Sequence, residues 1–433
     1  MRALFARILL AVAFSSTGIA QTMFRGDAHH TGVSQETGPA TLHGTKWTFA
    51  TGGRILSSPV LDRGTLYIGS DDGALHALNV ATGKSLWKFA TGGPVRSTAA
   101  VVDGTVYFGS YDGQFYSVSA DKGELRWKFA TGGERRFEAK GLHGSTPATQ
   151  TTSDPWDCYL SSPVVAEGRV IFGSGDGQVY ALEAKTGALV WKFATGDVVH
   201  ASPAFADGRV FVGSWDSRLY ALDAKTGREL WHFQAGLDPK DHNQVGFQSS
   251  PAVADGIVYV GCRDAQLYAL DAATGKEKWR FDNHGSWVIT SPAVVNGHVL
   301  FGTSDTAKIH VLDAATGTLQ RSMQAGSFVF ASPTIAGSVA YVGVMNGSLL
   351  AFDWEKGVAL WEFQTAAARE NKLQVLNPDH THNLEKEFRN EFFDLHVHSM
   401  ERIFSVGSIM STPLVSGGVV FIGSTDGNVY AIE

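Results

Sequence analysis

Residues 202–236 read SPAFADGRVFVGSWDSRLYALDAKTGRELWHFQAG, and residues 57–93 carry the same phrase as SSPVLDRGTLYIGSDDGALHALNVATGKSLWKFATGG. Each copy consists of four short apolar segments that are separated by turns such as Asp-Gly and Thr-Gly. Glycine takes the positive φ that tight turns require, and the alternating segment LYALD is typical of a half-buried strand. The phrase therefore predicts a four-stranded antiparallel sheet.

The phrase occurs eight times along the chain. Each copy has a glycine before its central turn, and these glycines are Gly69, Gly109, Gly173, Gly213, Gly261, Gly302, Gly343 and Gly423. Their successive spacings are 40, 64, 40, 48, 41, 41 and 80 residues. The basic period of about 40 is the length of a propeller blade. One such sheet exposes apolar faces, so neighbouring copies have to stack to bury them.

The two ends of the chain together make one copy. The eighth copy stops at Glu433, after its third segment, and the missing fourth segment stands at the other end as KWTFATGG, residues 46–53. A ring that is closed in this way has no exposed seam. We therefore predict an all-β eight-bladed propeller of four-stranded blades, in which the N-terminal strand completes the last blade.

Large aromatic rings recur at one position of the repeat. Seven of the eleven tryptophans stand in the fourth segment, and the sixth copy has Arg321 there instead. A ring at a fixed place in every copy is expected to pack between blades, with its indole N–H bonded to an acceptor. These residues are Trp47, Trp87, Trp127, Trp191, Trp231, Trp279 and Trp361.

The first twenty residues predict a cleaved secretory signal. Arg2 and Arg7 give a basic start before an apolar run at 8–14, and the small-x-small sequence GIA stands at 18–20. A membrane span would need about 20 apolar residues, and no later segment reaches that length. Residues 21–433 are then one propeller domain, periplasmic or secreted. No cysteine follows the cleavage site, so we expect no lipid anchor.

The net charge limits the kinds of partner that the protein can bind, and the cysteine content shows whether disulfides can hold the fold together. The formal net charge of −7 argues against nucleic acid, which needs a basic surface. Cys158 and Cys262 stand in no metal-binding or haem-attachment pattern. Export permits disulfides, and these two would pair if the loop with Cys158 crosses the face of the propeller. We expect a monomer whose framework is not built on disulfides, and the pairing stays open.

Three insertions account for the long spacings. They occupy residues 134–160, 237–248 and 366–410, each between a fourth segment and the first segment of the next copy. In a propeller these crossovers share one face with the turns between second and third strands. Loops that gather on a rigid scaffold often carry function, although neutral loop growth is the alternative. We therefore expect one decorated face.

Two residues in each copy lie on that face and vary between copies. One precedes the repeated Ser-Ser or Ala-Ser pair, and the other precedes the Asp of the central turn. Arginine and aromatic residues suit binding hot spots, whereas ordinary solvated turn residues are the alternative. The predicted binding rim, on the second, fourth and fifth blades, consists of Arg96, Tyr111, His200, Trp215, Gln248 and Arg263.

The last insertion predicts a capped amphipathic helix over 383–395. Its apolar stripe consists of Leu384, Phe388, Phe392 and Leu395. Histidines flank the helix on both sides, at His380, His382, His396 and His398. A helix of this length, about 20 Å, holds the two pairs too far apart to share one metal ion. We predict surface histidines without a metal, beside a stripe that packs on the propeller or fills a partner's groove.

The pattern AxDxxTGxxxW resembles the repeat of quinoprotein propellers. It stands as Ala221, Asp223, Thr226, Gly227 and Trp231 in the fourth copy, and recurs between 269 and 279. The stretches MFRGD at 23–27 and HTG at 30–32 also resemble the start of many bacterial proteins with pyrroloquinoline-quinone (PQQ)-like repeats. The resemblance covers nearly the whole chain after residue 20.

The resemblance implies three kinds of protein. Some members are enzymes that bind PQQ and calcium and oxidise alcohols or sugars. Others are non-catalytic propellers, including a lipoprotein that assists outer-membrane barrel assembly, and some are sensor domains of kinases. Here the adjacent cysteine pair and the haem motif of the enzymes are missing, as are the lipoprotein's anchoring cysteine and any kinase motif. The scattered carboxylates, which show no calcium or acid–base spacing, are Glu138, Asp154, Asp157, Asp238 and Asp241.

These observations favour a non-catalytic exported scaffold. It would bind a protein, a peptide or an envelope polymer through its decorated face, without cofactor or metal. The alternative is a divergent PQQ-dependent oxidoreductase, which would need PQQ and calcium. Fold alone does not separate the two, because one fold hosts many functions.

Overall fold

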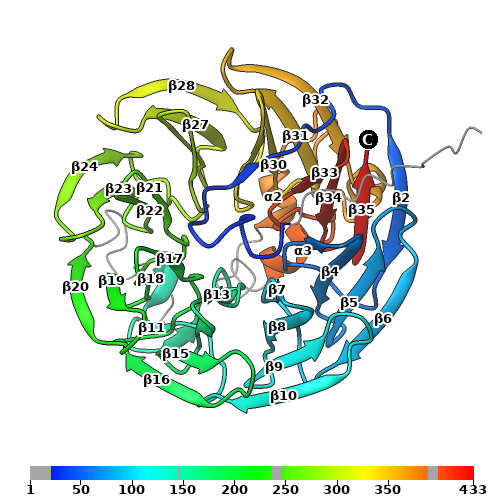
Figure 1. Ribbon diagram of the computed structural model, residues 1–433. Coiled ribbons are helices and arrows are strands. Elements are labelled where there is room, and N and C mark those ends of the chain that lie inside the picture. Colours follow the sequence, from blue (N-terminus) through cyan, green and yellow to red (C-terminus); the bar gives the residue numbers. More distant parts are fainter. Residues whose placement is uncertain (1–20, 145–146, 237–245, 389–397) are drawn as a thin grey trace, which may run out of the picture.

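The structure, a computed structural model, describes residues 21–144, 147–236, 246–388 and 398–433. Eight sheets stand around a central axis like the blades of a wheel (Figure 1), which confirms the predicted eight-bladed propeller. The predicted signal segment, residues 1–20, lies outside the described residues.

Each blade is an antiparallel meander whose first strand is innermost. Blade one consists of β3 (Val60–Asp62), β4 (Thr65–Ser70), β5 (Ala74–Asn79) and β6 (Ser85–Ala90). Blade two consists of β7 (Ala100–Val102), β8 (Thr105–Gly109), β9 (Gln114–Ser119) and β10 (Leu125–Ala130). Blade three consists of β13 (Val164–Ala166), β14 (Arg169–Gly173), β15 (Gln178–Glu183) and β16 (Leu189–Ala194). Blade four consists of β17 (Ala204–Ala206), β18 (Arg209–Gly213), β19 (Arg218–Asp223) and β20 (Glu229–Gln234).

The remaining blades repeat this order. Blade five consists of β21 (Ala252–Ala254), β22 (Ile257–Gly261), β23 (Gln266–Asp271) and β24 (Glu277–Asp282). Blade six consists of β25 (Ala293–Val295), β26 (His298–Gly302), β27 (Lys308–Asp313) and β28 (Leu319–Gln324). Blade seven consists of β29 (Thr334–Ala336), β30 (Val339–Gly343), β31 (Ser348–Asp353) and β32 (Val358–Gln364). Blade eight consists of β33 (Leu414–Ser416), β34 (Val419–Gly423), β35 (Asn428–Ile432) and β2 (Thr45–Ala50).

Blade eight closes the ring as predicted. Its sheet has the order β2-β35-β34-β33, with Trp47 opposite Ala431 in antiparallel register. Lys46 Nζ also lies 3.2 Å from Glu433 Oε2. The two ends of the chain are therefore joined by a full strand pairing.

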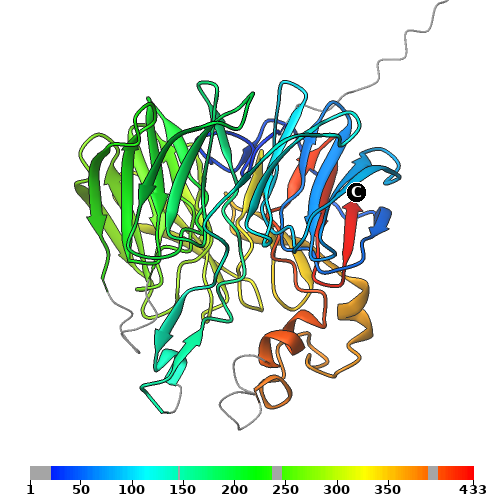
Figure 2. The same ribbon diagram turned by 90° about the horizontal axis from the view of Figure 1, so that it is seen from below.

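The segment before β2 adds a feature that the repeat does not predict. Residues 21–34 cross the wheel on the face opposite the insertions (Figures 1 and 2), and their backbone bonds to the innermost strands of successive blades. Arg25 donates to the backbone oxygen of Pro292 at 2.9 Å and to that of Pro333. β1 (Val33–Ser34) pairs in parallel with β29, so blade seven has five strands instead of four.

The repeated tryptophans lie between blades and their indole N–H groups donate to backbone oxygens, as predicted. Trp191 Nε1 donates to the backbone oxygen of Ala224 at 3.0 Å, and its ring lies against Gly227. Asp223 accepts from the N–H and hydroxyl of Thr226 and so shapes the Thr-Gly turn. The AxDxxTGxxxW pattern thus describes a turn that receives the tryptophan of the preceding blade.

The first and third insertions project from the same face (Figure 2), as the sequence predicts. The first contains a hairpin of β11 (Glu138–Lys140) and β12 (Thr151–Ser153), with the 3₁₀ turn η1 (Leu142–Gly144) between them. The third contains α1 (Ala366–Glu370), α2 (Leu384–Glu387) and α3 (Ser399–Phe404). Most of the second, residues 237–245, lies outside the described residues.

The helix predicted over 383–395 is wrong in its length. Asn383 caps its start by accepting from Lys386 N–H, but α2 ends at Glu387 and Phe388 is extended. Phe388 instead turns into an apolar cluster on the propeller, which is a tertiary contact that overrides the helical pattern. Residues 389–397, with Phe392, Leu395 and His396, lie outside the described residues. The helices that the structure describes are too short to cross a membrane.

Candidate functional site

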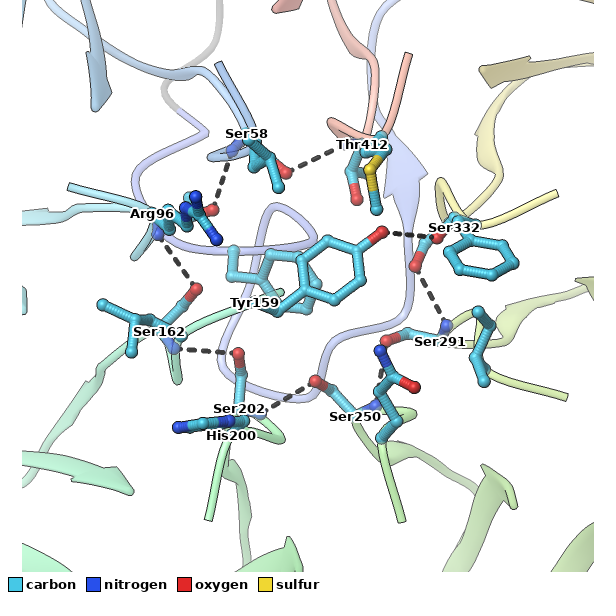
Figure 3. A pocket seen from close by; sticks show the side chains of 18 residues that line it. Ser58, Arg96, Tyr159, Ser162, His200, Ser202, Ser250, Ser291, Ser332 and Thr412 are labelled. Atoms are coloured by element: carbon cyan, nitrogen blue, oxygen red, sulfur yellow. Dashed lines mark hydrogen bonds between the residues drawn. The ribbon is translucent and has the colours of Figure 1, made fainter. Parts of the chain in front are cut away.

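A ring of hydroxyl groups surrounds the axis of the propeller (Figure 3). At seven steps around the ring, the backbone N–H of one blade donates to the Ser or Thr hydroxyl of the next at 2.8–3.1 Å. Such a circuit satisfies buried backbone donors at the centre, where no sheet partner is available. The ring consists of Ser58, Thr98, Ser162, Ser202, Ser250, Ser291, Ser332 and Thr412.

Two aromatic side chains narrow the channel inside this ring. Phe24 of the N-terminal segment and Tyr159 of the first insertion both line it, and Tyr159 lies across its centre (Figure 3). Tyr159 Oη donates to the backbone oxygen of Phe330 at 3.1 Å, and burial raises the pKa of this phenol well above its ordinary value. The cavity that remains has a volume of about 40 Å³, which is room for about three water molecules.

All six residues of the predicted binding rim contact the first insertion. Arg96 donates to Cys158 O, Tyr111 to Tyr159 O and Gln248 to Trp156 O. His200 bonds to Asp157, and Arg263 to Asp154. The ring of Trp215 stacks on Phe137 with centroids 4.7 Å apart. The structure therefore gathers the predicted residues into one binding surface, and its occupant is another part of the same chain.

Arg96 is held by an acidic and a carbonyl partner at once. Its Nε and Nη2 donate to the two carboxylate oxygens of Asp71 at 2.8 and 2.7 Å, while Nη1 reaches Cys158 O at 3.1 Å. The guanidinium also lies 5.2 Å from the ring centroid of Tyr111. Burial opposes the charge of Arg96, but Asp71 raises its pKa above the ordinary value. Arg96 thus carries a fixed positive charge under the insertion.

His200 lies between two carboxylates of the first insertion. Its Nδ1 is 2.6 Å from Asp157 Oδ1, and its Nε2 is 3.5 Å from Glu134 Oε2. Burial disfavours the imidazolium, but Asp157 and Glu134 outweigh it and raise the pKa of His200 to about 10. His200 is therefore protonated at neutral pH and completes a buried charge triad.

Arg263 forms a second buried triad. Its Nη1 donates to Asp154 Oδ2 at 2.5 Å, and His143 Nε2 lies 3.1 Å from Asp154 Oδ1. Burial favours the neutral acid, but Arg263 and His143 hold the pKa of Asp154 below its ordinary value. The guanidinium also contacts the indoles of Trp215 and Trp287, at 4.7 and 3.8 Å from their centroids.

The expectation of an exposed rim needs a correction. Trp215 and Arg263 are fully buried, His200 and Gln248 are buried, and Arg96 and Tyr111 are half-buried. The physical reason is that the insertion brings the complementary carboxylates and carbonyls down onto these side chains. Of the carboxylates that the sequence analysis left without a role, Asp157 pairs with His200 and Asp154 with Arg263. Their distance along the chain from these basic residues follows no pattern, so the sequence did not indicate the pairing.

The third insertion docks beside the first over the mouth of the channel. Arg54 donates to Glu401 of α3 at 3.0 Å, and His382 bonds to Glu387 and Ser327. Side chains of both insertions and of the inner blade ends pack into one apolar cluster. Its buried members are Leu56, Cys158, Ile289, Phe330, Met345, Met400, Ile403, Phe404 and Met410. The two insertions are thus one continuous cap.

The outer surface of this cap offers apolar and polar groups to solvent. Leu373 and Leu384 of the third insertion are 55% and 58% exposed. Beside them an open pocket of about 400 Å³ is lined by residues of 368–383, including Arg369, Gln374 and His380. Because these groups are already exposed, a partner could contact them without any rearrangement of the propeller.

The cysteines and histidines form no metal site or disulfide in the described part of the chain. Cys158 and Cys262 are free, buried thiols, which answers the question of their pairing. Both His380 and His382 bond to side chains of the cap or the propeller. No group of three His, Cys, Asp or Glu side chains among the described residues is arranged to hold a metal ion.

The axial cavity does not fit the quinone cofactor that the family resemblance implies. PQQ is a fused tricyclic molecule with three carboxylates, and sites for molecules of this size measure about 300 Å³ or more. The cavity of about 40 Å³ is far smaller, and Leu56, Leu160, Ile289 and Met410 give it an apolar lining. The basic residues that could bind carboxylates there, Arg96 and His200, are already paired with Asp71 and Asp157.

Comparison with solved structures shows the fold. BamB from Moraxella catarrhalis matches with a TM-score of 0.63 and 17% identity, over 90% of this chain and 97% of that one. A europium-containing methanol dehydrogenase matches with a TM-score of 0.70 and 14% identity, over 96% and 98%. Quinohemoprotein alcohol dehydrogenase from Comamonas testosteroni matches with a TM-score of 0.68 and 15% identity, over 95% and 80%.

Comparison by sequence shows the family. No curated protein matches the chain. A family model described as outer membrane protein assembly factor BamB, built on a PQQ-type repeat, matches residues 33–154, 139–280 and 263–380. These matches overlap and run through seven blades. The chain therefore belongs to the BamB-type family of PQQ-repeat propellers.

Proposed function

We propose that this protein is a non-catalytic, exported scaffold that binds an envelope protein or peptide through the outer surface of its cap. The cap is the surface made by the described residues of the first and third insertions, 134–160 and 366–410. The observation that carries the proposal is that this cap is anchored from below by buried ion pairs while it presents exposed leucines above.

A rigid support is what such a role requires. Residues that are held in place before binding lose little conformational entropy when a partner docks. The triads at His200 and Arg263 fix the first insertion. The pair of Arg54 and Glu401 and the bond of His382 to Ser327 hold the third. The family match to an outer membrane protein assembly factor favours a partner among the proteins that assemble or insert into the outer membrane.

The quinoprotein alternative has less support. The axial cavity is too small for PQQ, and the similarity to dehydrogenases, at 14–15% identity, concerns the fold. Purified protein incubated with PQQ and calcium tests this alternative directly. A saturable rise in Tm together with reduction of an artificial electron acceptor would replace the scaffold proposal.

The scaffold proposal is tested by matched surface variants. Leu373→Asp with Leu384→Asp places charges on the cap, whereas Leu86→Asp with Leu125→Asp places them on equally exposed leucines of the outer strands β6 and β10. We expect crosslinking in intact envelopes to recover the same partner with the wild type and the outer-strand variant. Recovery should fall at least tenfold with the cap variant.

Two results would contradict the proposal. One is loss of the partner with the outer-strand variant but not with the cap variant, which would place the interface on the outer strands of the blades. The other is a partner pattern that no variant changes, including a chain from which 366–410 is deleted. Cell fractionation of the same strains tests the expected export.

A further inference from the structure

Arg263 keeps an unused pair of hydrogen-bond donors in the interior. Its Nη1 is bonded to Asp154, but Nε and Nη2 have no hydrogen-bond partner within the described part of the chain. The side chain is fully buried. A buried donor without an acceptor destabilises the folded state, so two of them on one guanidinium need a physical explanation.

Other arginines of the molecule show what this pair of donors binds. Nε and Nη2 of Arg96 grip both oxygens of Asp71 at 2.8 and 2.7 Å. The same two nitrogens of Arg280 grip both oxygens of Glu277 at 2.8 and 2.7 Å. Two parallel N–H groups match the geometry of a carboxylate. Arg263 presents the same fork of two N–H groups, and no carboxylate of the described residues accepts from them.

The surroundings of the fork contain a further donor and so favour a hydrogen-bond acceptor at this place. The indole N–H of Trp215, whose ring the guanidinium contacts, is a further buried donor without a partner among the described residues. A guanidinium has five N–H donors, so a second anion on its free edge does not displace Asp154. The contacts with Trp215 and Trp287 leave the plane of the guanidinium as the direction of approach.

We propose that the Arg263 fork is a binding site for a small carboxylate anion of the size of formate or acetate. The anion accepts side-on from Nε and Nη2 of Arg263. The site differs from the outer cap surface, and it does not depend on the scaffold function. Phe137, Asp154 and His143, which surround the stack, all belong to the first insertion, so a bound anion stabilises the docked insertion.

Burial sets the size of the ligand and its route. Arg263 and Trp215 are fully enclosed, which excludes bulky acids. Small ions reach such sites when a covering segment opens locally. Binding should therefore be slow compared with binding at an exposed site, and it should protect the first insertion from proteolysis.

The test uses the full chain and three probes at constant ionic strength. Sodium acetate is titrated against sodium chloride, and acetamide serves as a neutral molecule of the same shape. We expect Tm to rise saturably with acetate, and to stay unchanged with chloride or acetamide, because a ligand that binds the native state stabilises it. No difference between acetate and chloride in the wild type overturns the proposal, since the fork then holds water.

Variants locate the effect. Arg263→Lys keeps a positive charge beside Asp154 but has no fork, and we expect at least a tenfold higher acetate concentration for half of the effect. Arg280→Lys, whose fork is already occupied by Glu277, is the matched control and should respond like the wild type. An equal response of Arg263→Lys and the wild type places the anion elsewhere and overturns the proposal.

One further measurement does not rely on a folded variant. In arginine-labelled wild-type protein, the Nε–Hε resonance of Arg263 should shift as acetate binds, and an unchanged resonance overturns the proposal. A tripeptide with a free C-terminus, compared with its amide, separates the two sources of a carboxylate. A response to the free peptide without one to acetate shows that the site recognises a chain end, which contradicts binding of a free small anion.

Discussion

Single glycines of the repeat meet two requirements that no other residue satisfies together. Gly275 in the Thr-Gly turn of blade five has a φ of +71°, and a Cβ there would lie 2.6 Å from the ring of Trp231. Gly256, two strands earlier in the same blade, has a φ of +73° but open space around it. An alanine at Gly256 therefore tests backbone strain alone, whereas an alanine at Gly275 tests backbone strain and packing together.

We expect Gly256→Ala to lower the free energy of unfolding by about 1 kcal/mol, which is the cost of a left-handed conformation for alanine. Gly275→Ala should lower it by about 3 kcal/mol, because the methyl group also overpacks the tryptophan. Urea unfolding followed by tryptophan fluorescence measures both. Equal losses would show that the tryptophan contact contributes nothing.

The charge of His200 makes stability depend on pH. Its pKa is raised to about 10 in the folded chain, against about 6.5 when unfolded. Its contribution is therefore fully present below pH 6.5 and is lost as the pH rises to 10. We expect His200→Gln to cost about 3 kcal/mol at pH 6, because it breaks a buried ion pair, and the difference from the wild type to narrow towards pH 10.

Denaturant unfolding of both proteins between pH 6 and pH 10 measures this difference. His232, an exposed histidine whose Nδ1 lies 2.7 Å from Glu229, is the control site, and His232→Gln should have a small effect at every pH. A constant gap between His200→Gln and the wild type would contradict a protonated His200.

At the scale of elements, the first insertion is held on the propeller by contacts between its side chains and those of other blades. Its residues Asp154 and Asp157 enter basic and aromatic positions that belong to blades four and five. Within the insertion, the hairpin of β11 and β12 carries an exposed tip. Docking, rather than hairpin stability, should therefore decide whether the insertion is ordered.

We expect Asp154→Asn to lower the free energy of unfolding by about 3 kcal/mol, because it leaves Arg263 buried without an ionic partner. It should also speed cleavage by thermolysin before Phe137 and Leu142, which are buried while the insertion is docked. Glu124→Gln, at an exposed turn of blade two, is the control. Unchanged cleavage in Asp154→Asn would show that other contacts suffice to dock the insertion.

At the scale of the whole molecule, closure and channel sealing are separate tasks of the N-terminal region. β2 completes blade eight, whereas residues 21–34 bond to the inner strands. Pro39 adds a further contact, because its backbone oxygen accepts from Trp361 at 2.9 Å. In other blades the tryptophan at this position packs on the Thr-Gly turn of the next blade, but blade eight has no such turn.

Two shortened chains separate these tasks. A chain that begins at Thr51 lacks β2, leaves the edge of β35 open and should aggregate or fail to fold. A chain that begins at Thr45 keeps β2 and should remain monomeric, with a Tm several degrees lower because the contacts of Arg25 and Pro39 are gone. Light scattering after size exclusion, together with thermal unfolding, measures both. A monomeric, cooperatively folded chain from Thr51 would contradict closure by β2.

The sequence by itself determined the number of blades, the closure by β2, the tryptophan positions and the face of the insertions. These features depend on local turn chemistry and on contacts that recur with a fixed period, so each is repeated in the chain. The six variable residues of the rim were also found in this way, because packing between blades does not dictate them.

Only the tertiary structure decided what those six residues bind. The pair of Asp154 and Arg263 joins residues 109 positions apart, and it occurs in one blade only among the described residues. Two other contacts also occur once in the described part of the chain and do not follow the repeat. One is the crossing of the propeller by residues 21–34, and the other is the packing of Phe388 into the apolar cluster of the cap instead of a longer helix. Such contacts have no period, and their energy depends on burial and on complementary charge, which exist only once the chain is folded.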